Sequence, residues 1–146
     1  MRVCLDTNIL ISFLLAPSSD GPPSRVVREC IDGAFDLVVS DLVIEELTRK
    51  ISTKSYLMQR ISPNEAHRFE RLVRGIASVK ADVTEFIPAV TASRDPDDDY
   101  LIALSVVEGV DYLVSGDKDL LALGNVMNVR IVSPADFLLL LDSLRN

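Results

Sequence analysis

Acidic side chains stand beside the short apolar segments of this 146-residue chain at four separated places. These places are Asp6, Glu45-Glu46, Asp97 to Asp99, and Asp117 with Asp119. Carboxylates brought to one point repel one another strongly unless protons or a cation neutralise them. Oxygen ligands without His or Cys select Mg²⁺ or Mn²⁺ rather than zinc. The acids therefore predict a Mg²⁺ or Mn²⁺ site, provided that the fold brings them together.

Such a site supports hydrolysis of a phosphodiester. A bound divalent ion activates a water molecule and stabilises the charge that develops on the phosphate. A serine-histidine-aspartate arrangement does not compete, because the one histidine, His67, is expected in the middle of a helix and far along the chain from the acids. We therefore expect a metal-dependent phosphodiesterase.

Short apolar segments alternate with helical patterns along the chain. Strands are expected at residues 2–5, 36–40, 112–115 and 129–132, with an extended segment at 79–87. Helices are expected at residues 8–16, 24–32, 41–52, 63–77 and 97–108, with a last one after 133–136. Parallel strands need a helix to return the chain, so this alternation favours an α/β sandwich with helices on both faces of a parallel sheet. The carboxyl ends of the strands, where the acids lie, would then share the ligand-binding edge.

Helical phase distinguishes between neighbouring acids. In the 97–108 helix, Asp99 falls inside the predicted buried stripe, and Asp97 and Asp98 point away from it. That stripe consists of Ile102, Ala103, Val106 and Val107. In the 41–52 helix, Glu46 lies on the flank of the inner face, and Glu45 turns toward solvent. That inner face consists of Val43, Ile44, Leu47 and Ile51. We favour Asp99 and Glu46, with Asp98 and Glu45 as the one-residue alternatives.

Two acids follow the predicted strand at 112–115. Asp117 and Asp119 would face the same way if this segment is extended, because side chains alternate along a strand. Asp117 is nearer to the end of the strand and is the stronger candidate.

Each acid also has an ordinary structural explanation. Asp6 could cap the helix that follows it, and the 97–99 cluster could be a solvated first turn. The two glutamates could pair with Arg49 and Lys50 one turn later, and Asp117 could be a turn residue. All four explanations holding together at one sheet edge is a weaker hypothesis than a shared metal site.

Four motifs, in this order along the whole chain, resemble those of the PIN-domain ribonucleases, in particular the toxin-like PIN proteins of the VapC type. The motifs are Asp6-Thr7-Asn8 after an apolar strand, Glu46-Leu47, Asp99-Tyr100-Leu101-Ile102-Ala103, and Leu113-Val114-Ser115-Gly116-Asp117-Lys118-Asp119. The resemblance implies a catalytic and metal-binding quartet of Asp6, Glu46, Asp99 and Asp117. It also implies Asp119 as a fifth metal ligand, with polar support from Asn8 and Ser115. Ser115 stands where many members have Thr, and it keeps the hydroxyl group.

The same resemblance implies a fold, a reaction and partners. The fold would be a PIN-like three-layer α/β sandwich with a central five-stranded parallel sheet flanked by helices. The reaction would be cleavage of single-stranded RNA by a Mg²⁺- or Mn²⁺-dependent endoribonuclease. The protein would be the toxin of a type II toxin–antitoxin pair, and a protein antitoxin would block its active site.

The charges are distributed unevenly. The net charge of −7 would by itself disfavour a polyanionic partner. Between Arg49 and Lys80, however, eight basic residues stand against two acidic ones, a local net charge of +6. In the 63–77 helix, Arg68, Arg71 and Arg74 form either a ridge that binds the RNA backbone or an ordinary solvated face.

Composition bounds the remaining expectations. No repeat or linker divides residues 1–146, so we expect a single domain. Cys4 and Cys30 lie in apolar stretches without metal-ligand spacing, which favours free thiols and a cytoplasmic location. No apolar run reaches the length of a membrane span, so no membrane partner is expected. The apolar helical segments at 9–15 and 137–141 either offer surface for a homodimer or are mostly buried against the sheet.

Two other functions fit the sequence less well. A receiver-like or aspartyl-phosphate signalling module also places acids at strand ends. It needs a second acid directly after the first strand, where Thr7 and Asn8 stand, and a lysine after the last strand, where Ser133-Pro134 stands. A PIN-like protein that binds RNA without cleaving it would not need the full quartet.

Overall fold

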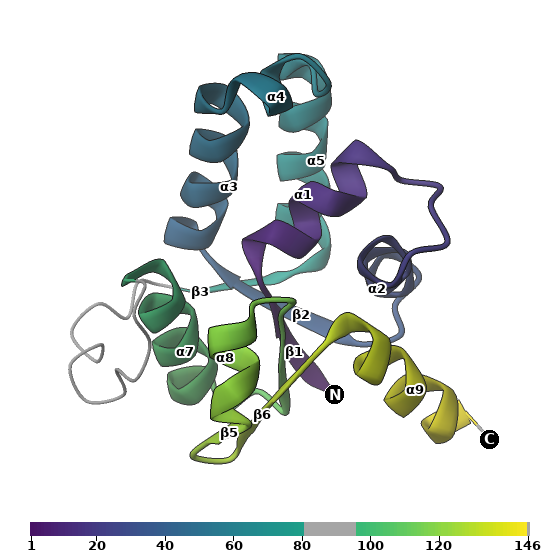
Figure 1. Ribbon diagram of the computed structural model, residues 1–146, viewed down its shortest axis with the longest axis vertical. Coiled ribbons are helices and arrows are strands. Elements are labelled where there is room, and N and C mark those ends of the chain that lie inside the picture. The colour runs from purple at the N-terminus through teal and green to yellow at the C-terminus, as the bar shows by residue number, and fades with distance from the viewer. Residues whose placement is uncertain (81–95, 146) are drawn as a thin grey trace.

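The computed structural model describes residues 1–80 and 96–145, and its centre is a six-stranded sheet in the order β3-β2-β1-β4-β6-β5 (Figure 1). The strands are β1 (Arg2–Leu5), β2 (Asp36–Ser40), β3 (Ser78–Lys80), β4 (Tyr112–Val114), β5 (Asn125–Val126) and β6 (Val129–Val132). Neighbouring strands are parallel except for β5, which pairs antiparallel with β6. The predicted parallel arrangement of five strands is confirmed, and the two-residue strand β5 adds a sixth at one edge.

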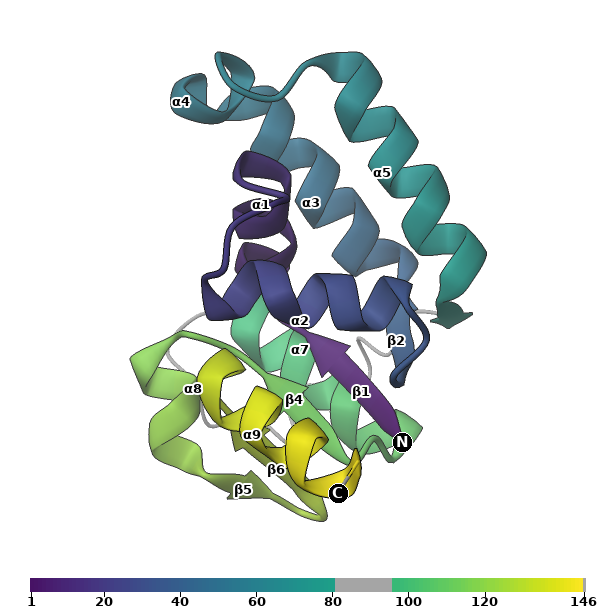
Figure 2. The same ribbon diagram turned by 90° about the vertical axis from the view of Figure 1, so that its right-hand side faces the viewer.

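Helices cover both faces of the sheet (Figures 1 and 2). They are α1 (Thr7–Leu15), α2 (Pro22–Ile31), α3 (Asp41–Thr53), α4 (Ser55–Met58), α5 (Pro63–Ile76), α7 (Pro96–Glu108), α8 (Lys118–Leu123) and α9 (Pro134–Arg145). Helices α1, α2 and α9 lie on one face, and α7 and α8 lie on the other. Helices α3, α4 and α5 extend away from the strands, and we call them the helical arm. The three-layer α/β sandwich is therefore confirmed.

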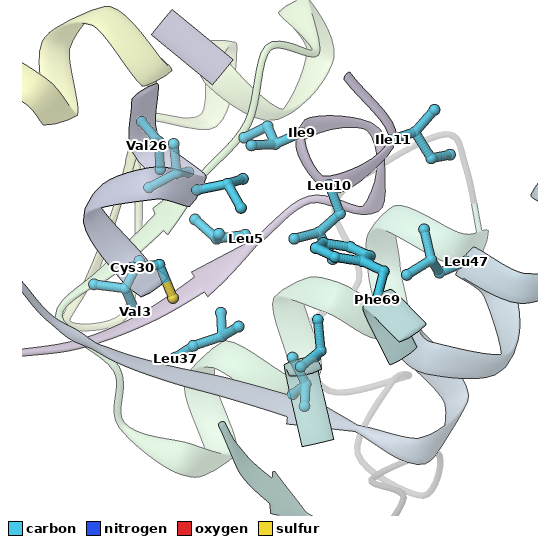
Figure 3. Close-up of a cluster of buried hydrophobic side chains, with 14 of the residues drawn as sticks. Val3, Leu5, Ile9, Leu10, Ile11, Val26, Cys30, Leu37, Leu47 and Phe69 are labelled. Carbon is cyan, nitrogen blue, oxygen red and sulfur yellow. The ribbon is translucent and has the colours of Figure 1, made fainter. Parts of the chain in front are cut away.

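Strand side chains alternate between two cores, as a sheet covered on both faces requires. In β1, Val3 and Leu5 belong to the core under α1 and α2, and Cys4 belongs to the core under α7. Figure 3 shows the first core, in which Leu5 lies among side chains that include Leu10 of α1 and Phe69 of α5. This core continues into the helical arm and ties the arm to the sheet.

The helical arm packs on α1 through aromatic rings. Phe13 and Phe69 stack with their ring centroids 5.5 Å apart. The apolar residues that we expected to offer a dimer surface are largely used within the chain itself. Ile9, Leu10 and Ile11 of α1 are buried, and so are Phe137, Leu138 and Leu141 of α9.

Most predicted elements are present, with shifts at their ends. Ser62 caps α5 by accepting the backbone N–H of Glu65 at 3.1 Å, as the capping sequence predicted. Prolines occupy the first turn of α2, which begins two residues earlier than predicted. Residues 81–87 of the predicted extended segment lie outside the described residues. The short elements α4, α8 and β5 were not predicted.

One prediction about the core is wrong. Val107 was assigned to the buried stripe of its helix, but its side chain is exposed. Helix α7 is buried on all sides over residues 99–105, and its last turn, which contains Val107, reaches solvent. Helical phase gives direction around a helix but cannot show where along its length the helix leaves the core.

Cys4 and Cys30 are buried free thiols, as predicted. Burial raises the pKa of each thiol to about 12. None of the helices within residues 1–80 and 96–145 has both the length and the apolar composition needed to cross a bilayer.

Candidate active site

The strand order reverses between β1 and β4. The chain proceeds outward from β1 through β2 to β3 and then returns to the other side of β1 as β4. Parallel α/β sheets bind ligands outside the carboxyl ends of the strands at such a reversal. Asp6 follows β1 and Ser115 follows β4. The backbone N–H of Asp6 donates to the Val114 carbonyl at 2.9 Å, so the two segments are in direct contact.

Ser115 joins two of the predicted acids. Its hydroxyl donates to Asp6 Oδ2 at 2.7 Å and accepts the backbone N–H of Asp117 at 3.0 Å. Asp6 Oδ1 accepts the backbone N–H of Asn8 at 3.1 Å, so Asp6 also caps α1. Asp6 is only 6% exposed and Ser115 is fully buried. Within the described residues the hydrogen-bond donors to the Asp6 carboxylate are neutral, although buried carboxylates usually have charged partners.

Asp117 does not continue an extended strand. It caps α8, and its Oδ1 accepts the backbone N–H groups of Asp119 at 2.8 Å and Leu120 at 3.1 Å. Asp119 lies in the first turn of α8 and is exposed. The expected extended arrangement of Asp117 and Asp119 is therefore wrong, because β4 ends at Val114 and α8 begins at Lys118.

Glu46 reaches the end of β1 from α3. The Thr7 hydroxyl donates to Glu46 Oε2 at 3.2 Å, and Lys50 Nζ lies 2.9 Å from Glu46 Oε1. The Glu46 side chain is 16% exposed, whereas Glu45 faces solvent as helical phase predicted. The structural explanation for Glu46, an ion pair with Lys50, is also confirmed. Glu46 can therefore be both an ion-pair partner and a site residue.

Asp99 is 8% exposed in α7, in agreement with its helical phase. The next residue, Tyr100, donates its hydroxyl to Ser40 Oγ at 2.8 Å. Ser40 in turn caps α3 by accepting the backbone N–H of Val43 at 3.3 Å. Helix α7 is thereby fixed to the beginning of the helix that carries Glu46. The side chains of Asp97 and Asp98 lie outside the described residues, so the alternative ligand Asp98 is not placed.

The candidate metal ligands at this edge are carboxylate oxygen atoms, which fit Mg²⁺ or Mn²⁺ better than zinc. The structure joins Asp6 to Asp117 through Ser115, and it joins the residue after Asp6 to Glu46. In the described part of the chain, however, no three His, Cys, Asp or Glu side chains are grouped closely enough to hold one metal ion. The donor chemistry fits a divalent ion, and gathering the ligands around it requires side-chain movement.

Thr7 and Tyr100 have contacts at this edge that sequence reasoning did not assign. Thr7 and Tyr100 lie inside the recognised motifs, next to an acid, which is a signal that could have been used. Lys50 was identified only as a pairing partner at helical spacing.

The predicted arginine ridge on α5 is only partly available. Arg68 and Arg71 are exposed. Arg74 instead forms ion pairs with Asp41 at 2.8 Å and with Glu70 at 3.6 Å, and the hydrogen bond to Asp41 raises its pKa. A groove of about 390 Å³ lies on the helical arm, and the predicted acids do not line it.

The fold is an α/β domain in which Asp6 and Asp117 lie at the reversal of strand order. The family model of the PIN domain matches residues 2–119, and this chain therefore belongs to the PIN-domain family. A comparison with curated proteins finds no significant match.

Three solved structures share the fold. PAE2754 from Pyrobaculum aerophilum is 17% identical with a TM-score of 0.66, covering 98% of this chain and 90% of that chain. VapBC2 from Rickettsia felis, bound to a DNA fragment from its promoter, is 12% identical with a TM-score of 0.62, covering 91% and 98%. VapC20 from Mycobacterium tuberculosis, a sarcin-ricin loop cleaving toxin, is 16% identical with a TM-score of 0.60, covering 88% and 98%.

Proposed function

We propose that this PIN-domain protein is a Mg²⁺- or Mn²⁺-dependent endoribonuclease that cleaves single-stranded RNA. The observation that carries the proposal is the contact of Asp6 with Ser115, and through it with Asp117, at the reversal of strand order. A buried carboxylate with neutral donors is favourable where a bound cation offsets its charge. The receiver-like alternative rested on acids at strand ends, and the PIN family accounts for such acids as well. We therefore do not retain that alternative.

The proposed roles of the residues rest on the PIN-domain motifs, supported for some of them by contacts in the structure. Asp6, Glu46, Asp99 and Asp117 would hold the ion, with Asp119 as a further ligand. When bound, the ion supplies an activated water and offsets the charge that develops on the phosphate. Ser115 orients Asp6, and Thr7 orients Glu46. The backbone N–H of Asn8 holds the other oxygen of Asp6.

Binding of the RNA backbone is assigned to the helical arm. Arg68 and Arg71 are exposed cations on α5, and a single strand of RNA presents one phosphate per nucleotide. Arg74 contributes less, because Asp41 and Glu70 already neutralise it.

We extend the proposal to a biological role as the toxin of a type II toxin–antitoxin pair. It is supported by the similarity of the fold to VapC20, described as a toxin that cleaves the sarcin-ricin loop, and to the VapBC2 complex. A protein antitoxin would act by blocking the acidic edge.

The decisive experiment compares Asp6→Asn with the parent protein on a panel of single-stranded RNAs, in Mg²⁺, in Mn²⁺ and in EDTA. We expect the cleavage rate of Asp6→Asn to fall on the order of 10²–10³-fold, and EDTA to abolish cleavage by the parent. The control is Asp36→Asn, an exposed acid at the amino end of β2, which should cleave at the parental rate.

Two outcomes would contradict the proposal. Equal cleavage by Asp6→Asn and the parent would exclude Asp6 from the reaction. RNA binding without cleavage in either metal would favour the non-cleaving PIN-like alternative.

A further inference from the structure

Both oxygens of the Glu46 carboxylate are already engaged. Oε2 accepts the Thr7 hydroxyl at 3.2 Å, and Oε1 lies 2.9 Å from Lys50 Nζ. Thr7 is buried on the short helix that follows β1, so its hydroxyl is held by the fold. Lys50 is on α3 itself, one turn after Glu46, and its ammonium is carried by a flexible four-carbon stem. Of the two partners, Lys50 is the one that can leave.

The Glu46–Lys50 pair is more sheltered than the Asp41–Arg74 pair on the same part of the protein. Its side chains are 16% and 24% exposed, compared with 54% and 41% for Asp41 and Arg74. Charges that are shielded from water interact more strongly than exposed ones. Glutamate at the earlier position of an i, i+4 pair is also the favourable order on a helix. The pair is therefore built to keep Glu46 neutralised.

We propose that Lys50 is a built-in counter-ion that occupies Glu46 Oε1 in the metal-free protein and that a divalent ion must displace from it. The proposal depends on the proposed function, because it assumes that Glu46 is a metal ligand. Carboxylates near one point need a cation, and Lys50 supplies one when no metal is bound. Thr7 keeps its hydrogen bond to Oε2, so Glu46 retains its orientation while the ammonium moves away.

The exchange has opposite consequences for the two forms of the protein. Lys50 stabilises the metal-free form by pairing with a carboxylate that is mostly buried. It weakens metal binding, because the ammonium competes for the same oxygen and repels a divalent ion. Removal of the Lys50 charge should therefore tighten metal binding while it lowers the melting temperature of the metal-free protein.

The test is calorimetric titration of the full chain with Mn²⁺, supported by thermal unfolding with and without Mn²⁺. Lys50→Gln should bind Mn²⁺ about tenfold more tightly than the parent. Lys50→Arg keeps the positive charge and should bind Mn²⁺ with nearly parental affinity. The matched control is Lys54→Gln, which removes an exposed lysine directly after the end of α3 and should leave the affinity unchanged.

Glu46→Gln separates failure of this proposal from failure of the proposed function. If the parent does not bind Mn²⁺, or if Glu46→Gln binds it as well as the parent does, the metal site and the counter-ion proposal are both overturned. If Glu46→Gln loses affinity but Lys50→Gln binds Mn²⁺ equally or more weakly than the parent, only the counter-ion proposal is overturned. The same holds if Lys50→Arg binds Mn²⁺ as tightly as Lys50→Gln does.

Discussion

The acidic edge of the sheet and the basic helical arm hold their charged groups in different ways. At the edge, Asp6 and Ser115 are buried and joined by a hydrogen bond across 109 positions of the chain. On the arm, Arg68 and Arg71 are exposed, and Arg74 pairs with surface carboxylates. The edge therefore holds Asp6 in a defined arrangement through a buried hydrogen bond, whereas the arm contributes positive charge without a fixed arrangement.

This difference predicts how each region responds to substitution. Loss of one partner from a buried hydrogen bond costs about 1–3 kcal/mol, because the other partner remains unsatisfied. Exposed ion pairs usually contribute less than about 1 kcal/mol, since water and salt screen them. Substitutions of buried residues at the edge should therefore change activity and stability more than substitutions of exposed charged residues on the outer helices α2, α5 and α9.

Ser115→Ala should have the largest effect of the four substitutions and titrations considered below. It removes the hydroxyl that fixes Asp6 and reaches the Asp117 backbone. We expect the RNA cleavage rate to fall about 10–100-fold, as when a group that orients a metal ligand is lost. Stability should fall by about 1–3 kcal/mol in urea denaturation. Ser115→Thr keeps the hydroxyl and should retain most of the activity.

The matched control is Ser133→Ala. Ser133 also follows a strand, but its hydroxyl caps α9, by accepting the backbone N–H of Asp136 at 3.1 Å. This variant should lose about 1 kcal/mol of stability and keep the parental cleavage rate. If both serine variants lose activity equally, the Ser115 hydroxyl has no particular role in orienting Asp6. The proposed difference between the edge and the arm would then be wrong.

The sequence predicted the features that depend on local pattern. The alternation of apolar segments indicated the parallel sheet, and the helical phase of Asp99 and Glu46 indicated their burial. The capping sequence at Ser62 located the beginning of α5. In each case a few neighbouring residues contain the whole physical cause, so no tertiary information was needed.

Features that depend on distant contacts could not be predicted in this way. Arg74 pairs with Asp41, 33 positions earlier, and no local pattern shows this contact. The extended arrangement of Asp117 and Asp119 was wrong because Asp117 starts the six-residue helix α8. The hydrogen bond from Tyr100 to Ser40 joins two helices that only the fold brings together.

The two buried thiols test how well the sheet interior is sealed from water. Burial raises the pKa of Cys4 and Cys30 to about 12, whereas exposed thiols in the unfolded chain ionise near 9. The folded state therefore keeps protons that the unfolded state loses. Their contribution to stability is complete below pH 9 and should decline as pH rises toward 12, at about 1 kcal/mol per pH unit for each thiol.

The measurement is urea denaturation at several pH values for the parent and for the Cys4→Ala/Cys30→Ala double variant. The parent should lose stability more steeply above pH 9 than the double variant. Thiol labelling of the folded parent at pH 8 should also be slow. Rapid labelling without unfolding would show that the thiols are accessible and that the sheet interior is less sealed than we describe.

The arm should respond through RNA affinity rather than through catalysis. The double variant Arg68→Gln/Arg71→Gln lacks two exposed cations. Its plot of log affinity against log salt should therefore be less steep than that of the parent, by about 1.4 in the magnitude of the slope. Arg74→Gln should change the slope less, because Asp41 and Glu70 already neutralise that arginine. Fluorescence anisotropy of a labelled single-stranded RNA over a salt series measures both. A larger change for Arg74→Gln would mean that RNA displaces its acidic partners.

The smallest effect is expected at the ion pair between Glu29 of α2 and Arg145 of α9. The hydrogen bond from Arg145 holds the pKa of Glu29 below its usual value. The pair therefore adds stability above the ordinary pKa of glutamate, and that stability is lost as pH falls through the lowered value. Both side chains are solvent-accessible, so Glu29→Gln should scarcely change the melting temperature at pH 7. A loss as large as that of Ser115→Ala would show that outer-helix charges can be as important as buried contacts, and would remove the distinction between the two regions.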